Sequence, residues 1–141
     1  MAAFNKFRPF VENLGRGVID LDNDTLKVFL TNSAPVNTNG VKADLTEIAA
    51  GNGYTAGGNV VANNAYSQTA GVGKLTGDDV VFTAAGGSIG PFRYAALYDD
   101  TPTSPADPLI GWWDYGSSIT LAAGETFTVD LDQTNGILTI T

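Results

Sequence analysis

The sequence predicts an all-β protein, specifically an antiparallel jelly-roll-like β-sandwich with at most two short helices. Apolar and polar residues alternate with a period of two over most of the chain from Thr25 onward. Turn signals that contain glycine, a residue present 17 times, separate the alternating segments. Many short strands with regularly spaced turns are typical of a sandwich or barrel, and the jelly roll is the version with eight strands.

Length and composition predict one folded domain. The chain has 141 residues, of which 43% are apolar and 16% are charged, a balance that allows one hydrophobic core. No linker or repeat divides it. We therefore expect a single β-sandwich domain over residues 1–141, with an N-terminal arm formed by about the first 20 residues.

Two segments depart from the alternation and are predicted to be short helices. The segment FRPFVENLG places Pro9 in a first helical turn and Gly15 at the end. The segment KADLTEIAAG offers Asp44 as a cap with Glu47 three residues later, and it would end at Gly51.

Strands are predicted between these helices and the end of the chain. The segments 25–31 (TLKVFLT) and 125–132 (ETFTVDLD) alternate clearly enough to predict strands with one buried face. Further strands are expected at GNVVA, AYSQT, GVGKLT, DDVVFTA, FRYAALYDD, LIGWWDYG, SSITL and GILTIT. Glycine and Asn-Gly suit turns that need a positive φ, which predicts turns at Gly57-Gly58, Gly71, Gly77, Gly86-Gly87, Gly90-Pro91, Gly124 and Asn135-Gly136.

Aromatic side chains are concentrated on the two strands before and after the loop 100–108. Neighbouring side chains of a strand point to opposite faces, so Trp112 and Trp113 are not expected to enter the same core. We expect one indole in the core and the other under a partner surface or the N-terminal arm. The alternation also predicts two shared faces on LIGWWDYG and one on PFRYAALY: Trp113 with Tyr115, Ile110 with Trp112, and Phe92 with Tyr94, Ala96 and Tyr98.

An exposed aromatic row has three explanations that the sequence leaves open: a sugar-stacking platform, an oligomer interface, or the outer face of a sheet beneath a loop. The N-terminal arm adds phenyl rings at every third position, and these must be buried on its own domain or on a neighbour. The candidate residues of a subunit or capsid interface are Phe4, Phe7, Arg8, Phe10, Trp112 and Trp113.

Several classes of site and partner are not expected. The chain has no cysteine and no histidine, so disulfides, thiol nucleophiles, zinc-type ligand sets and the commonest general base are excluded. The net charge is −8 and the seven basic residues are scattered, which argues against direct binding to nucleic acid. No apolar run approaches the ~20 residues of a membrane helix. We expect no cofactor and no membrane partner.

The acidic residues do not predict a metal site or an enzyme. Asp20, Asp22 and Asp24 match the first ligands of an EF-hand loop, but Thr25 and Thr31 stand where that loop needs glycine and glutamate, so an acidic turn is expected. The remaining carboxylates lie at predicted strand ends, polar faces, caps or turns, and we expect no catalytic residues. Activity that depends on Asp114 or Glu125 would contradict this expectation.

The segments TLKVFLTNSAPV, DLTEIAAGNGYTAGG and GGSIGPFRYAALYDDTPTSPADPLIGWWDYGSSITLAAGETFTVDLD resemble capsid cement (decoration) proteins of tailed bacteriophages. The resemblance covers nearly the whole chain. It implies a jelly-roll sandwich, made in the host cytoplasm, that binds the capsid exterior of the virion as a dimer or trimer and bridges neighbouring major capsid proteins without a cofactor. The alternative is a glycan-binding or accessory module of a phage tail or host-attachment structure.

Overall fold

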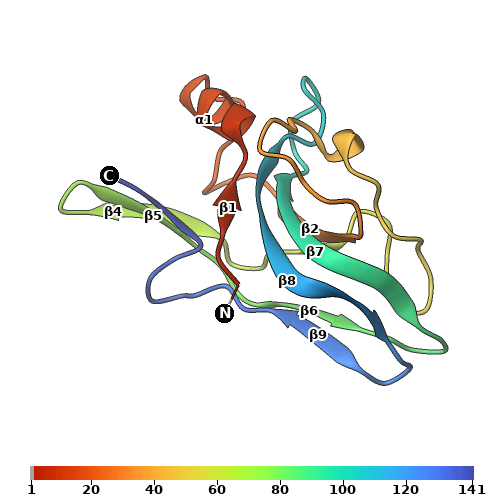
Figure 1. The fold of residues 1–141 in the computed structure, drawn as a ribbon. Coiled ribbons are helices and arrows are strands. Elements are labelled where there is room, and N and C mark those ends of the chain that lie inside the picture. Colours follow the sequence, from red (N-terminus) through yellow and green to blue (C-terminus); the bar gives the residue numbers. More distant parts are fainter. Residues whose placement is uncertain (1) are drawn as a thin grey trace.

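The computed structural model describes residues 2–141 and is all-β (Figure 1). Strands account for 44% of the residues and helices for 8%, and the sheets are antiparallel. The predicted fold class, an all-β sandwich-like fold, is therefore confirmed. No helix within residues 2–141 combines the length and the apolar character needed to cross a membrane.

Three sheets contain the strands of residues 2–141. A five-stranded sheet has the order β1-β8-β7-β2-β3, a three-stranded sheet has the order β10-β5-β4, and β6 pairs with β9. The elements are β1 (Asn5–Lys6), α1 (Arg8–Gly15), β2 (Leu26–Thr31), the 3-10 turn η1 (Lys42–Asp44), β3 (Asn59–Val60), β4 (Ala65–Thr69), β5 (Val72–Thr76), β6 (Val80–Thr83), β7 (Ile89–Asp99), β8 (Leu109–Leu121), β9 (Thr126–Val129) and β10 (Leu138–Ile140).

The five-stranded sheet is covered on both faces. One face packs against β6 and β9 in the main core, and the other packs against the loop 32–58 and the N-terminal segment in a second cluster. On β2, Leu26 faces the main core, whereas Phe29 is fully buried in the second cluster. The prediction that this strand buries only one face was wrong, because residues distant in sequence cover the other face.

The second predicted helix does not form. Only the 3-10 turn η1 is present, and residues after it are irregular. The Asp44 carboxylate accepts hydrogen bonds from the N–H groups of Gly40 and Val41, so it closes the preceding turn and does not cap a helix after it. The helix predicted at FRPFVENLG is present as α1, with Pro9 in its first turn.

Irregular pairing between β7 and β8 changes which residues share a face. The segments LIGWWDYG and SSITL form one strand, β8, with extra residues between Asp114 and Ile119, and Gly90-Pro91 lies inside β7 instead of in a turn. Register shifts place Ile110 in the main core although Trp112 contacts the second cluster. Phe92 likewise lies in the main core, opposite to Ala96 and Tyr98. The predicted shared faces of Ile110 with Trp112 and of Phe92 with Ala96 and Tyr98 were wrong, because a bulge reverses the alternation beyond it. Trp113 and Tyr115 line a common pocket, as their predicted shared face requires.

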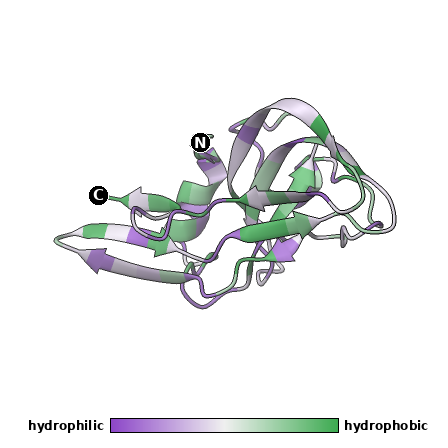
Figure 2. Cartoon of the chain, turned by 90° about the horizontal axis from the view of Figure 1, so that it is seen from below, coloured by the Kyte–Doolittle hydropathy of each residue, from purple (hydrophilic) through white to green (hydrophobic). Residues whose placement is uncertain are grey.

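A projecting arm, the three-stranded sheet β10-β5-β4, extends from this body (Figure 1). Its hairpin turn contains Ala70 (φ 53°) and Gly71 (φ 82°), the positive φ pair of a type I′ turn. In Figure 2, the projecting hairpin carries both hydrophobic and hydrophilic colours, and on β5 the buried Leu75 follows Lys74. Only the part of the arm near the body joins the main core.

Candidate functional site

The N-terminal strand β1 lies beside the two tryptophans. Asn5 pairs with Trp112 in the antiparallel register. The ring centroids of Phe4 and Trp113 are 5.2 Å apart, and those of Phe7 and Trp112 are 4.5 Å apart. Phe4 and Phe7 are an odd number of residues apart, so an extended segment directs them to opposite faces, as it does the tryptophans. Each indole therefore packs against one phenyl ring of the N-terminal segment.

The candidate interface residues are divided between buried and exposed positions. Phe7 and Phe10 are 0% and 2% exposed within a single chain, while Arg8 is exposed at the start of α1. Phe4, Trp112 and Trp113 are half-buried. The N-terminal arm thus packs on its own domain, one of the two arrangements expected. Contact of these six residues with another subunit or a capsid stays a prediction.

Gly111 makes room for this packing. A Cβ atom at residue 111 would overlap the Phe4 ring and approach the backbone oxygen of Asn5. The glycine between Ile110 and Trp112 therefore allows the N-terminal segment to lie close to β8.

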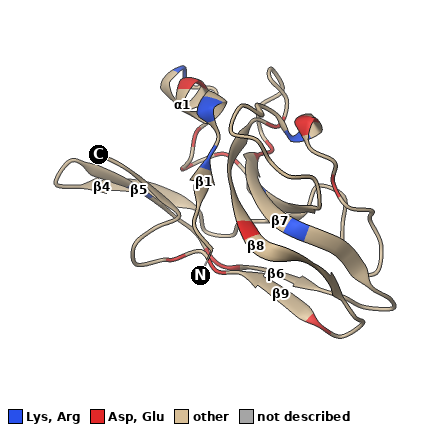
Figure 3. Cartoon of the chain, in the orientation of Figure 1, with Lys and Arg blue, Asp and Glu red and all other residues tan. Residues whose placement is uncertain are grey.

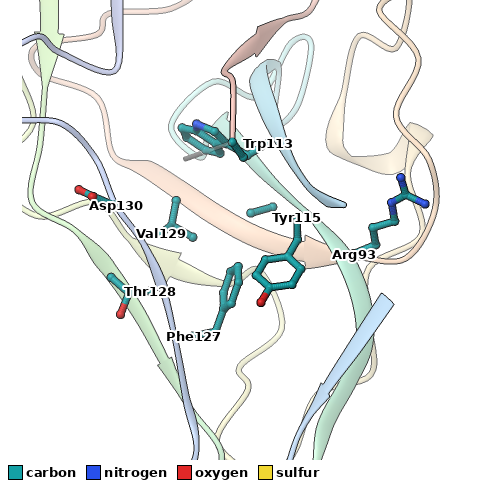
Figure 4. Close-up of a pocket in the computed structure, with 9 residues that line it drawn as sticks. Arg93, Trp113, Tyr115, Phe127, Thr128, Val129 and Asp130 are labelled. Atoms are coloured by element: carbon teal, nitrogen blue, oxygen red, sulfur yellow. The ribbon is translucent and has the colours of Figure 1, made fainter. Parts of the chain in front are cut away.

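A pocket of about 270 Å³ opens beside Trp113, between β8 and β9 (Figure 4). Trp113, Tyr115, Phe127 and Val129 converge on it, and Ala95 contributes to its lining. The Tyr115 and Phe127 rings meet edge to face at 5.7 Å, and Tyr115 is 55% exposed. The pocket is thus an apolar recess with aromatic walls, of the kind that accepts a flat apolar face.

Charged groups lie at the edge of this pocket. Arg93 donates two hydrogen bonds to Asp114, with Nε to Oδ1 at 2.8 Å and Nη2 to Oδ2 at 3.1 Å. The hydrogen bond from Arg93 is the main reason that the pKa of Asp114 is below its ordinary value. Asp130 also lines the pocket, and in Figure 4 its carboxylate points away from the aromatic walls.

The acidic segment 20–24 forms a turn, as predicted. Asp20 Oδ1 accepts hydrogen bonds from the N–H groups of Asp22 and Asn23, each at 3.0 Å. The Asn23 side chain and these backbone groups lower the pKa of Asp20. Among residues 2–141, no group of three or more His, Cys, Asp or Glu side chains is arranged to hold a metal ion.

Asp99 is a fully buried carboxylate at a strand end, where the sequence predicts an ordinary solvated aspartate. Its Oδ1 accepts the N–H of Thr101 at 3.0 Å, and its Oδ2 has no hydrogen-bond partner within the described chain. Burial, together with the carboxyl of Asp24, raises the pKa of Asp99 to about 8. Its position at the end of β7 resembles that of an ordinary solvated aspartate, so the sequence carried no signal of this burial.

Glu47 is a second residue whose role was missed, since its sequence position suggested a helix cap. Its carboxylate accepts hydrogen bonds from Tyr54 Oη at 2.6 Å, Gly57 N at 2.7 Å and Lys42 Nζ at 2.7 Å. Tyr54 Oη also accepts the N–H of Leu30 at 3.1 Å. Burial is the main cause of the raised pKa of Tyr54. Glu47 therefore fastens the loop 32–58 to β2.

The two carboxylates that were considered for catalysis have structural partners. Asp114 pairs with Arg93, and Glu125 Oε1 accepts the N–H of Ala122 at 2.6 Å in the turn before β9. Comparisons of the chain with protein-family models, curated proteins and solved structures found no match. The family resemblance thus stays a prediction, and a proposal about function depends on the geometry of this chain.

Proposed function

We propose that this chain is a non-catalytic structural protein that binds the outer surface of a tailed-phage capsid and bridges neighbouring major capsid subunits. The main support is the division of the molecule into a body packed on both faces of its central sheet and an arm that projects beyond it (Figure 1). A bridging protein needs a rigid body and contact surfaces that lie far apart.

The charge distribution also suits assembly with neighbours. Residues 1–18 contain three basic residues and one acidic residue, whereas the remaining residues contain four basic and 14 acidic residues. Arg8 and Arg16 are exposed on or next to α1, and acidic residues are distributed over the rest of the body (Figure 3). Opposite charges at separate places favour oriented contacts with neighbouring subunits.

The test is to locate the protein on purified phage heads by electron microscopy. We expect density on the capsid exterior between major capsid subunits, and we expect heads that lack the protein to lose packaged DNA at lower temperature. A protein that is absent from purified heads and monomeric in solution would overturn the proposal.

A second candidate function is glycan binding on a tail or attachment structure, favoured by the pocket beside Trp113. The Trp112→Phe variant retains Trp113 as its single tryptophan, so its fluorescence reports on the pocket. A change of emission on addition of host polysaccharide would support glycan binding, with Trp113→Phe as the matched control. An unchanged spectrum of Trp112→Phe would remove this candidate.

A further inference from the structure

The projecting arm leaves the outer edge of β4 open. β4 pairs with β5 on one side, and no strand of residues 2–141 pairs with its other side. Four of its five residues are exposed, and Figure 1 shows this edge extending away from the body. An open edge presents backbone N–H and C=O groups that another strand can bind.

The register identifies which backbone groups face outward. The type I′ turn makes Thr69 and Val72 a hydrogen-bonded pair, so Thr69, Ser67 and Ala65 direct their backbone groups toward β5. The backbone of Tyr66 and Gln68 then faces outward. The N–H of Tyr66 is satisfied by Asp22 Oδ1 at 2.9 Å, which leaves Gln68 as the centre of the open edge.

We infer that this edge binds a second copy of the chain by antiparallel pairing of the two β4 strands; the inference rests on the proposed function as an oligomeric capsid-binding protein. Two chains of net charge −8 repel each other over most of their surfaces. β4 (AYSQT) contains no charged residue and no proline, the usual features that protect an edge strand from pairing. The charged residue of the hairpin is Lys74 on β5, whose Nζ donates to the carbonyl of Thr134 at 2.8 Å.

Antiparallel pairing of two identical strands has two-fold symmetry, so the same residues contact each other in both directions. Pairing of the two β4 strands would join both arms into one continuous sheet, with a body at each end. Because Asp22 occupies the N–H of Tyr66, Gln68 is the outward-facing residue left for pairing, and each Gln68 would lie opposite the other.

The substitution Gln68→Lys tests this arrangement. It puts like charges opposite each other, and we expect self-association measured by sedimentation to weaken about fivefold to tenfold. The control Gln68→Thr, uncharged and well suited to a strand, should associate as the unmodified chain does. An equimolar mixture of Gln68→Lys and Gln68→Glu chains should regain the association that each lacks alone.

Two results would overturn the inference: a chain that stays monomeric at every concentration, or an oligomer that Gln68→Lys leaves unchanged. Neither result by itself overturns the proposed function, which fails only if the unmodified protein is in addition absent from purified phage heads. Circular dichroism of each variant verifies that the sheet is retained, and the recovery in the mixed sample requires both variants to be folded.

Discussion

The strands β2 and β5 both lie between two antiparallel neighbours but have different surroundings. In β2, both the alternating apolar residues and Phe29 between them are buried, because β6, β9 and the loop 32–58 cover opposite faces. In β5, Leu75 is buried, whereas Val72 toward the tip of the arm is 38% exposed. Burial is thus decided by what covers a strand, and substitutions in the body and in the arm should have different costs.

The largest effect is expected for Phe29→Ala, which removes a fully buried ring from the second cluster. We expect the free energy of unfolding to fall by about 3–5 kcal/mol, as for other Phe-to-Ala changes in cores. Urea denaturation measures this loss. A loss below about 1 kcal/mol would mean that the loop 32–58 does not seal the second face, and the contrast with the arm would fail.

A smaller loss is expected for Trp112→Ala. Trp112 packs against Phe7 but is only half-buried, so we expect a loss of about 2–3 kcal/mol. Phe7→Ala combined with Trp112→Ala in a double-mutant cycle should show coupling, because the two rings are in contact. Additive losses would indicate that the N-terminal segment is not docked on β8 in solution.

Asp99 predicts a pH dependence of stability in the body. Its raised pKa means that the folded protein holds the proton more tightly than the unfolded chain does. The contribution of Asp99 to the free energy of unfolding is therefore fully present below about pH 4. It is lost as the pH rises toward about 8, because the folded protein then has to bury a charged carboxylate. Asp99→Asn should remove this loss, so that the variant gains stability relative to the unmodified chain from pH 5 to pH 9 in thermal unfolding. A parallel pH profile of the two proteins would contradict the prediction.

The smallest effect is expected for Val72→Thr in the arm. Val72 is partly exposed and both residues favour strands, so we expect the free energy of unfolding to change by less than about 0.5 kcal/mol. Chemical denaturation of Val72→Thr and of Phe29→Ala under the same conditions compares the cost of a substitution in the projecting arm with that of a substitution in the body. A loss comparable to that of Phe29→Ala would show that the outer part of the arm is covered in solution.

Local signals were sufficient for much of the fold. Pro9 and Gly15 predicted α1, and the turn at Gly71 predicted the β4-β5 hairpin, because capping and positive φ are properties of a few adjacent residues. A local capping pattern gave the wrong role for Glu47, because it predicted a helix there. The pattern did not reveal that Tyr54 and Gly57 would donate hydrogen bonds to the Glu47 carboxylate.

The sequence by itself determined the all-β class, most strand positions and the opposite directions of Trp112 and Trp113, since these follow from short-range alternation. Only the tertiary structure decided that both indoles meet the N-terminal segment, that Phe29 and Asp99 are buried, and that bulges reverse the faces of β7 and β8. These features depend on contacts between residues far apart in the chain, and the period of a single strand does not encode which distant segment covers it.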